Sequence, residues 1–220
     1  MEKTGMKKRC RRLVSALLTL AMLLSLLPAA ALAAGETGTA SDLFISEYVE
    51  GSGTNKALEI YNGTGATVDL SQYTLCMVNF GGSGKPTKDA TLKSEPLSGS
   101  LENGQAYVYY NDGGTYDEAF QALEQKTANN NLCNFNGNDF VYLKKGDVII
   151  DVFGGTSPLM SEYPYEGAFA ADGTYIRNAA VTGPNPVYSP SEWSVQTKDY
   201  FSDLGRHTMG GGGGEVTPPD

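Results

Sequence analysis

The chain has 220 residues, enough for one domain and a tail, and its 16 basic and 25 acidic residues give a formal net charge of −9. An acidic chain repels polyanions, which argues against a protein that binds DNA or RNA through phosphate contacts. The one histidine, His207, makes no zinc ligand set with cysteines far from it in sequence, and we expect neither a metal nor a cofactor.

Residues 1–33 have the layout of a secretory signal peptide. Six basic residues precede the apolar run Leu13–Leu27, Pro28 ends the run, and Ala31-Leu32-Ala33 offers small residues for cleavage. An uncleaved anchor is the alternative, because Leu13–Ala34 is nearly long enough to span a bilayer, but Pro28 favours cleavage. We therefore expect a secreted or cell-surface protein with no stable membrane anchor. Cleavage would leave 10 basic and 24 acidic residues, a net charge of −14.

Short apolar segments separated by turn residues follow a flexible lead-in at residues 34–40. In the first of them, Leu43, Ile45 and Val49 are expected on one face of a strand, with Glu47 between them. Further strands are expected at Ala57–Tyr61, Val68–Phe80, Ala90–Leu92, Gln105–Tyr110, Asp139–Lys144, Asp147–Phe153 and Thr174–Arg177. A short helix is expected near Ala119–Leu123, after a capping-box pattern at Thr115–Glu118. Many short strands with one short helix predict an all-β sandwich.

The composition changes at the end of the chain. Gly210–Gly214 is a run of five glycines, and prolines follow it in Glu215–Asp220. Such a segment cannot pack a core, so we expect one β-sandwich domain over residues 41–209 and a linker or tail over residues 210–220. A linker suggests a further domain beyond it, whereas a secreted tail needs none.

Two cysteines, Cys76 and Cys133, remain after residue 33. Export permits a disulfide between them, which would close a long loop and stabilise the fold by on the order of 4 kcal/mol. Two buried free thiols are the alternative, and the spacing alone allows both. The export prediction favours the disulfide.

Glu47 and Glu59 are the most suggestive pair of polar residues, since they lie on adjacent expected strands and would face each other. Two close carboxylates can act as acid and base or hold Ca²⁺. The alternative, which we favour, is that each accepts hydrogen bonds from turn amides or from Lys56. The chain shows no GxSxG, HExxH or phosphate-loop motif, and we expect no catalytic residue.

Two further patterns have both a functional and a structural interpretation. Tyr107 and Tyr109 would stack on sugars if exposed, or would line the core edge of a sandwich if alternate residues face inward. Asn62-Gly63-Thr64 matches a glycosylation acceptor, although Asn-Gly is first of all a turn.

Four blocks of sequence carry a family resemblance: Leu43–Gly51, Lys56–Leu75, Asn136–Gly154 and Glu192–Thr208. They resemble the lamin tail domain (LTD) family, in particular its bacterial secreted branch. The resemblance implies an immunoglobulin-like β-sandwich without catalytic activity. The residues that match the family motif are Ser46, Glu47, Glu59, Asn62 and Trp193.

The resemblance and the predicted export suggest a secreted, non-catalytic module that binds, tethers or positions a partner at the cell exterior. One alternative is an N-terminal accessory domain of an extracellular nuclease or phosphoesterase, since such domains accompany hydrolases in the bacterial branch. This chain contains no hydrolase domain, so nuclease activity does not transfer to it. A glycan-binding module is the other alternative. The expected partner classes are therefore a hydrolase domain or a cell-surface glycan, and the ligand itself stays open.

Overall fold

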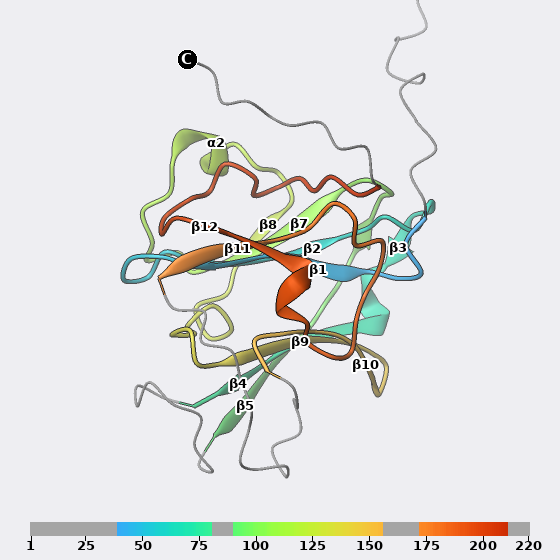
Figure 1. Cartoon of the computed structure of the whole chain (residues 1–220), viewed down its shortest axis with the longest axis horizontal. Helices are drawn as coiled ribbons and strands as arrows, with labels where there is room; N and C mark the ends of the chain where they lie inside the picture. The colour runs from blue at the N-terminus through green and yellow to red at the C-terminus, as the bar shows by residue number, and fades with distance from the viewer. Residues whose placement is uncertain (1–38, 81–89, 156–171, 211–220) are drawn as a thin grey trace, which may run out of the picture. The chain divides into compact units, whose positions relative to one another are not determined.

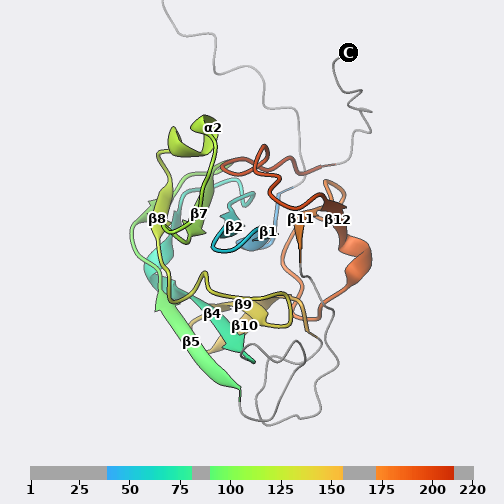
Figure 2. The same cartoon turned by 90° about the vertical axis from the view of Figure 1, so that its left-hand side faces the viewer.

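The strands of this computed structural model pack as two layered sheets, seen from two sides in Figures 1 and 2. The structure describes residues 39–80, 90–155 and 172–210. The predicted signal peptide at residues 1–33 and nearly all of the predicted lead-in and tail lie outside this range. Within it, no helix is long and apolar enough to cross a membrane.

The larger sheet has six strands in the order β12-β11-β1-β2-β7-β8, antiparallel except for the parallel pair β7–β8. The bounds of its strands are β1 Phe44–Glu50, β2 Lys56–Tyr61, β7 Ala106–Tyr110, β8 Lys126–Ala128, β11 Gly173–Arg177 and β12 Trp193–Gln196.

The smaller sheet has four antiparallel strands in the order β10-β9-β4-β5. Its strands are β4 Tyr73–Asn79, β5 Thr91–Pro96, β9 Phe140–Lys145 and β10 Val148–Phe153. The short strands β3 (Val68–Asp69) and β6 (Ser100–Leu101) pair separately. The prediction of an all-β, immunoglobulin-like sandwich is confirmed.

Helical structure is sparse in the described residues. The helix α2 spans Glu118–Gln121, and the side chain of Asp117 caps it by accepting a hydrogen bond from the Phe120 amide at 2.8 Å. The helix therefore lies close to the predicted segment, but Asp117 caps it in place of Thr115 of the predicted capping box, and it is a single turn. Two 3-10 turns, η2 (Leu70–Gln72) and η4 (Pro190–Glu192), precede β4 and β12.

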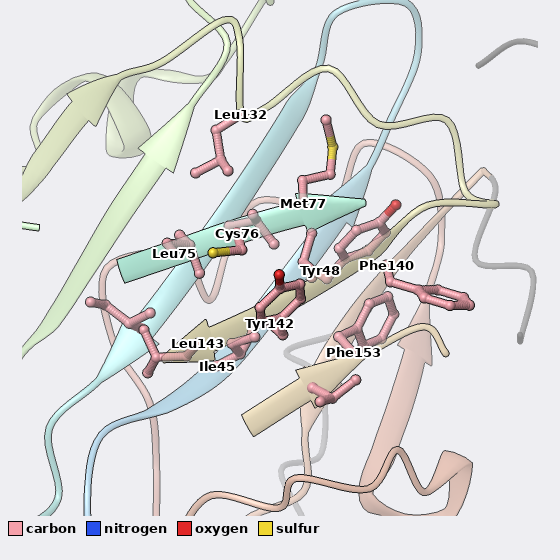
Figure 3. Close-up of a cluster of buried hydrophobic side chains, with 14 of the residues drawn as sticks. Ile45, Tyr48, Leu75, Cys76, Met77, Leu132, Phe140, Tyr142, Leu143 and Phe153 are labelled. Atoms are coloured by element: carbon pink, nitrogen blue, oxygen red, sulfur yellow. The ribbon is translucent and has the colours of Figure 1, made fainter. Parts of the chain in front are cut away.

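The core lies between the two sheets and is rich in aromatic rings (Figure 3). Tyr48 from β1 stacks on Phe153 from β10 at 4.2 Å and on Phe135 at 4.4 Å, which joins both sheets through one ring cluster. Each fully buried large apolar side chain contributes about 1.5–3 kcal/mol to folding. Most of this core consists of apolar residues on strands that the sequence analysis predicted.

A β-bulge in β1 changes which side chains face this core. Ile45 pairs with Ile60 and Glu47 pairs with Glu59, so Ser46 is an extra residue in β1. The alternation of faces therefore shifts by one residue after Ile45. The prediction that Leu43, Ile45 and Val49 share a face was wrong for Val49, because Leu43 and Ile45 join the core while Val49 packs on the opposite face.

The outer face of the six-stranded sheet is covered as well. Residues 197–210, which we name the C-terminal strap, cross this face together with α2, on the side away from the four-stranded sheet (Figures 1 and 2). Leu204 of the strap packs with Val49 and Phe120, and Met209 packs with Phe44 and Tyr61. The chain thus forms three layers over the described residues.

Candidate functional site

The carboxyl pair, Glu47 on β1 and Glu59 on β2, lies on the outer face of the six-stranded sheet beneath the strap. The two residues are direct partners in the register of the hairpin, because the bulge at Ser46 turns Glu47 to the side of Glu59. Their exposed fractions are 1% and 0%. Opposed residues of this kind have Cβ atoms about 5 Å apart, so two ionised carboxylates at these positions would repel each other.

Glu59 is held by donors from the sheet and from the strap, among them the backbone amide of Arg206. Its Oε1 accepts a hydrogen bond from the Ser46 hydroxyl at 2.6 Å, and its Oε2 accepts one from the Gly205 amide of the strap at 2.6 Å. Burial raises the pKa of Glu59 to about 8, and these hydrogen bonds limit the rise. Glu59 thereby links the sheet to a segment 146 residues further along the chain.

Glu47 has a different environment. Neither of its carboxyl oxygens makes a hydrogen bond to any of the described residues. Burial raises the pKa of Glu47 well above its ordinary value, and the neighbouring charges of Glu59 and Asp203 raise it further. Because Glu59 accepts hydrogen bonds and Glu47 does not, we assign to Glu47 the proton that the pair needs at neutral pH.

The expectation for the pair was partly correct. It is correct for Glu59, which accepts from the amide of Gly205 in a turn of the strap, and wrong for Glu47, which accepts no hydrogen bond among the described residues. Lys56 instead contacts Glu50, its register partner on the other face of the hairpin. In the part of the chain that the structure describes, no group of three or more His, Cys, Asp or Glu side chains is arranged to hold a metal ion.

A cavity of about 430 Å³ lies between the strap and strands β11 and β12. His207 of the strap lines it and packs edge-on against Phe44 and Tyr61, at ring distances of 5.4 and 5.0 Å. Burial lowers the pKa of His207 to about 4, so its ring is neutral at physiological pH. The remaining lining residues are Ile176, Arg177, Asn178, Ala179, Ser194, Gln196, Asp203, Arg206 and Thr208.

Asn62 holds a turn rather than offering a modification site. Its buried amide nitrogen donates to the carbonyl oxygens of Ala66 and Leu101, at 2.8 and 2.7 Å. Its carbonyl oxygen accepts from the amide and the hydroxyl of Thr64. A glycan needs that nitrogen free and exposed, so the structural interpretation of Asn62-Gly63-Thr64 applies.

Trp193 belongs to a buried charge network that the sequence did not reveal. Its ring lies 4.7 Å from the Arg177 guanidinium carbon and 4.7 Å from the ring of Phe153. Arg177, fully buried, pairs with Asp151 at 3.2 Å and with Glu192 at 2.8 Å. The only sequence cue was a charged residue at the end of an apolar strand. We name Arg177, Asp151 and Glu192 the arginine network.

The predicted disulfide is not formed in the structure, where Cys76 and Cys133 are both free and buried. Cys76 alternates on β4 with Leu75 and Met77, which face the six-stranded sheet, so its side chain lies on the other face of β4, beside Tyr142. Cys133 lies on the inner side, with Leu58 as its neighbour. The four-stranded sheet therefore separates the two thiols, although both belong to buried regions.

Tyr107 and Tyr109 do not form an exposed platform. Tyr109 is only 5% exposed, and the Tyr107 ring packs against the core while its hydroxyl is hydrogen-bonded to Thr127 at 2.6 Å. A sugar-stacking surface made by both rings is therefore not present. The core-edge interpretation of these tyrosines is the correct one.

The sandwich, its opening hairpin and the paired glutamates agree with a known domain family. The family model of the Lamin Tail Domain matches residues 36–157 of the 220-residue chain. The chain belongs to the lamin tail domain family. Lamin tail domains are immunoglobulin-like and non-catalytic, which agrees with the expectation from the sequence. No curated protein matches the chain.

The region that matches the lamin tail domain ends between β10 and β11. Four of the five motif residues, Ser46, Glu47, Glu59 and Asn62, lie inside it, and Trp193 lies beyond it. The strap also lies beyond it. The matched region thus contains the carboxyl pair, while the segment that covers the pair comes from the part of the chain that the family model does not match.

Proposed function

We propose that the chain is a secreted lamin tail domain protein that binds and positions a partner at the cell exterior and catalyses no reaction. The observation that carries the non-catalytic part is the burial of the carboxyl pair beneath the strap. A general acid or base must come within hydrogen-bonding distance of the reacting atoms. Glu47 and Glu59 cannot reach a substrate while the strap covers them, and Glu59 uses both oxygens to hold the structure together.

An activity assay tests this proposal. The purified chain should turn over neither phosphodiester nor nucleotide substrates when Mg²⁺, Ca²⁺ or Zn²⁺ is added. The variants Glu47→Gln and Glu59→Gln serve as matched controls for contaminating hydrolases, whose activity would be the same in all three preparations. Turnover by the parent chain that either variant abolishes would contradict the proposal.

The sequence of residues 1–33 supports the extracellular location that we propose. It also supports the proposal that the chain belongs to the bacterial secreted branch of the family. A basic start, an apolar run and a small-residue site are the parts that export and cleavage require. Expression in a host that secretes proteins should yield an extracellular product whose mass corresponds to a start at Ala34. A membrane-bound product that keeps residues 1–33 would contradict it.

The charge of the mature chain supports a partner other than a nucleic acid. Without residues 1–33 the chain carries 10 basic and 24 acidic residues. Nonspecific nucleic-acid affinity comes from Lys and Arg contacts to phosphates and falls steeply with salt. The chain should therefore show no measurable DNA binding at about 0.15 M salt, in a gel-shift titration.

A further inference from the structure

Hydrogen bonds hold the C-terminal strap against the six-stranded sheet and its loops at several places. One is the bond that the Thr174 hydroxyl of β11 donates to the Tyr200 carbonyl oxygen at 2.9 Å, which involves no charged group. Near its start, the side chain of Asp199 accepts hydrogen bonds from the Ser52 amide at 2.7 Å and the Asn55 side chain at 2.8 Å. In its middle, the Gly205 amide donates to Glu59 at 2.6 Å. At its end, the Gly210 amide donates to the carbonyl oxygen of Ala179 at 2.9 Å. The middle attachment is the one made to the carboxyl pair.

The two end attachments do not change charge near neutral pH. The attachment of Gly210 involves only backbone groups. Although burial opposes it, hydrogen bonds from Ser52 and Asn55 hold the pKa of Asp199 below its ordinary value, so this carboxylate stays ionised. Any response of the strap to pH in this range must therefore come from the middle attachment.

The surroundings of the carboxyl pair supply little compensating charge. The register neighbours of the pair across the sheet are Ile176 on β11 and Val108 on β7, both apolar. Arg206 is the cation of the strap that acts on Glu47, and its side chain is 72% exposed and already pairs with Asp203. The other titratable groups that face the pair or its cover are Tyr61, Tyr200, His207 and Arg177.

We propose that the strap is a pH-sensitive clasp, closed over the outer face of the six-stranded sheet while the carboxyl pair keeps a proton and released when the pair loses it. Two adjacent buried carboxylates without a buried cation repel each other and lack hydration. Lifting the strap would return both to water, where the repulsion is weak. Release would also uncover the apolar residues beneath it, among them Phe44, Tyr61 and Val49.

The direction of the pH effect follows from the folded pKa values. In the open state both carboxyls have ordinary values near 4.5, whereas in the closed state the pKa of Glu59 is raised to about 8 and that of Glu47 is raised as well. Closure therefore takes up a proton between these limits. Stability of the closed strap is fully present below about pH 4.5 and is lost as the pH rises through about 8, by up to about tenfold in the opening equilibrium per pH unit.

Hydrogen exchange of the full chain between pH 5 and pH 9 tests the clasp, with protection factors corrected for the intrinsic rate at each pH. Protection of the Gly205 amide and its strap neighbours should fall steeply between about pH 6 and pH 8, approaching about tenfold per unit. In Glu47→Gln the fall should be shallower than in the parent, because only one of the two buried carboxyls then titrates. The exposed Glu102→Gln is the matched control and should behave as the parent. Flat protection in the parent, or equal slopes in the parent and Glu47→Gln, would overturn the proposal.

A second measurement covers the case in which Glu47→Gln does not fold. Trypsin cleavage after Arg206 requires the strap to lift, since Leu204 and Met209 on either side of it are buried. The rate of cleavage after Arg206 in the parent chain, divided by the rate in a free peptide with the sequence of residues 197–210, should increase at least tenfold between pH 6 and pH 8. A constant ratio over this range would contradict the clasp.

Discussion

The arginine network and the carboxyl pair are two clusters of buried acidic groups that the fold treats in opposite ways. Asp151 is completely buried, yet its pKa rises only to about 6, because Arg177 and the amides of Asn185 and Ile45 offset the effect of burial. Glu59 is equally buried but has no buried cation beside it among the described residues, and its pKa rises to about 8. In the first cluster, the negative charge of the buried carboxylate is compensated by the cation Arg177. In the second, a bound proton reduces the negative charge of the pair.

The difference shows which part of the domain stays fixed as the pH changes and which part responds to pH. The pKa of Asp151, about 6, leaves this carboxyl ionised at neutral pH, and the arginine network joins β10, β11 and the η4 turn inside the sandwich. The carboxyl pair joins the sheet to the middle of the strap through the hydrogen bond from Gly205 to Glu59. Burial alone therefore does not decide whether a carboxyl group is a permanent part of the scaffold; the charge of its neighbours does.

The largest expected effect comes from removing the cation. Arg177→Met leaves Asp151 buried without its partner and should destabilise the fold by about 3–5 kcal/mol, the typical cost of breaking a buried ion pair. Urea denaturation measures this loss as a shift in the midpoint. A loss below about 1 kcal/mol would mean that Asp151 takes up a proton as readily as the carboxyl pair does, and the contrast between the clusters would disappear.

The next effect comes from displacing the strap. Gly205 has a backbone φ of 88°, and a Cβ atom there would clash with the Leu123 side chain. Gly205→Ala should therefore destabilise the fold by about 2 kcal/mol and lower the pKa of the carboxyl pair toward its ordinary value. Gly104→Ala is the matched control, since Gly104 has a φ of 80° and none of the described atoms lies within 4 Å of the position that its Cβ would take. Equal losses in both variants would show that Gly205 is strained only by its backbone angle.

The third effect is a dependence on pH. Glu47→Gln keeps the shape of the side chain but removes its charge, so it should leave the free energy of unfolding nearly unchanged at pH 5. At pH 8 the free energy of unfolding of the variant should exceed that of the parent by about 1–2 kcal/mol, because the parent has lost the proton that favoured the folded state. Urea titrations at both pH values measure the difference. A variant that is less stable than the parent at pH 8 would contradict the assignment.

The smallest effect concerns the exposed ion pair of the strap. Arg206 and Asp203 lie 3.4 Å apart at the surface, with exposed side-chain fractions of 72% and 38%. Such pairs contribute about 0–1 kcal/mol, so Arg206→Met should change the free energy of unfolding by about 0.5 kcal/mol or less in 0.15 M salt. A larger loss would make Arg206 a true counterion of the carboxyl pair and weaken the contrast with Arg177.

Local patterns in the sequence predicted most of the sandwich. Alternating apolar residues and turn signals located β1, β2, β4, β7, β9, β10 and β11, and they placed Glu47 beside Glu59. The strand β8 was missed because Lys126–Ala128 is short and polar and pairs in parallel, and β12 was missed because its one buried residue is Trp193. The disulfide was expected from redox conditions alone, which do not determine on which side of a sheet each cysteine lies.

The features that control the candidate site depend on contacts between distant segments. The bulge at Ser46 leaves no pattern in the sequence, yet it decides that Glu47 and Val49 face outward. The hydrogen bond from Gly205 to Glu59 spans 146 residues, and the bond from the Ile45 amide to Asp151 spans 106. Neither spacing nor periodicity carries such information, so the strap and the arginine network become visible only in the folded chain.

The proton on the carboxyl pair is tested most directly by NMR. The ¹³C chemical shifts of the Glu47 and Glu59 side-chain carboxyl carbons, followed from pH 4 to pH 9 in the full chain, report each ionisation separately. We predict that at least one of the two carboxyls stays protonated at pH 7 and titrates only as the pH approaches about 8. Titration of both with ordinary pKa values near 4.5 would contradict the account.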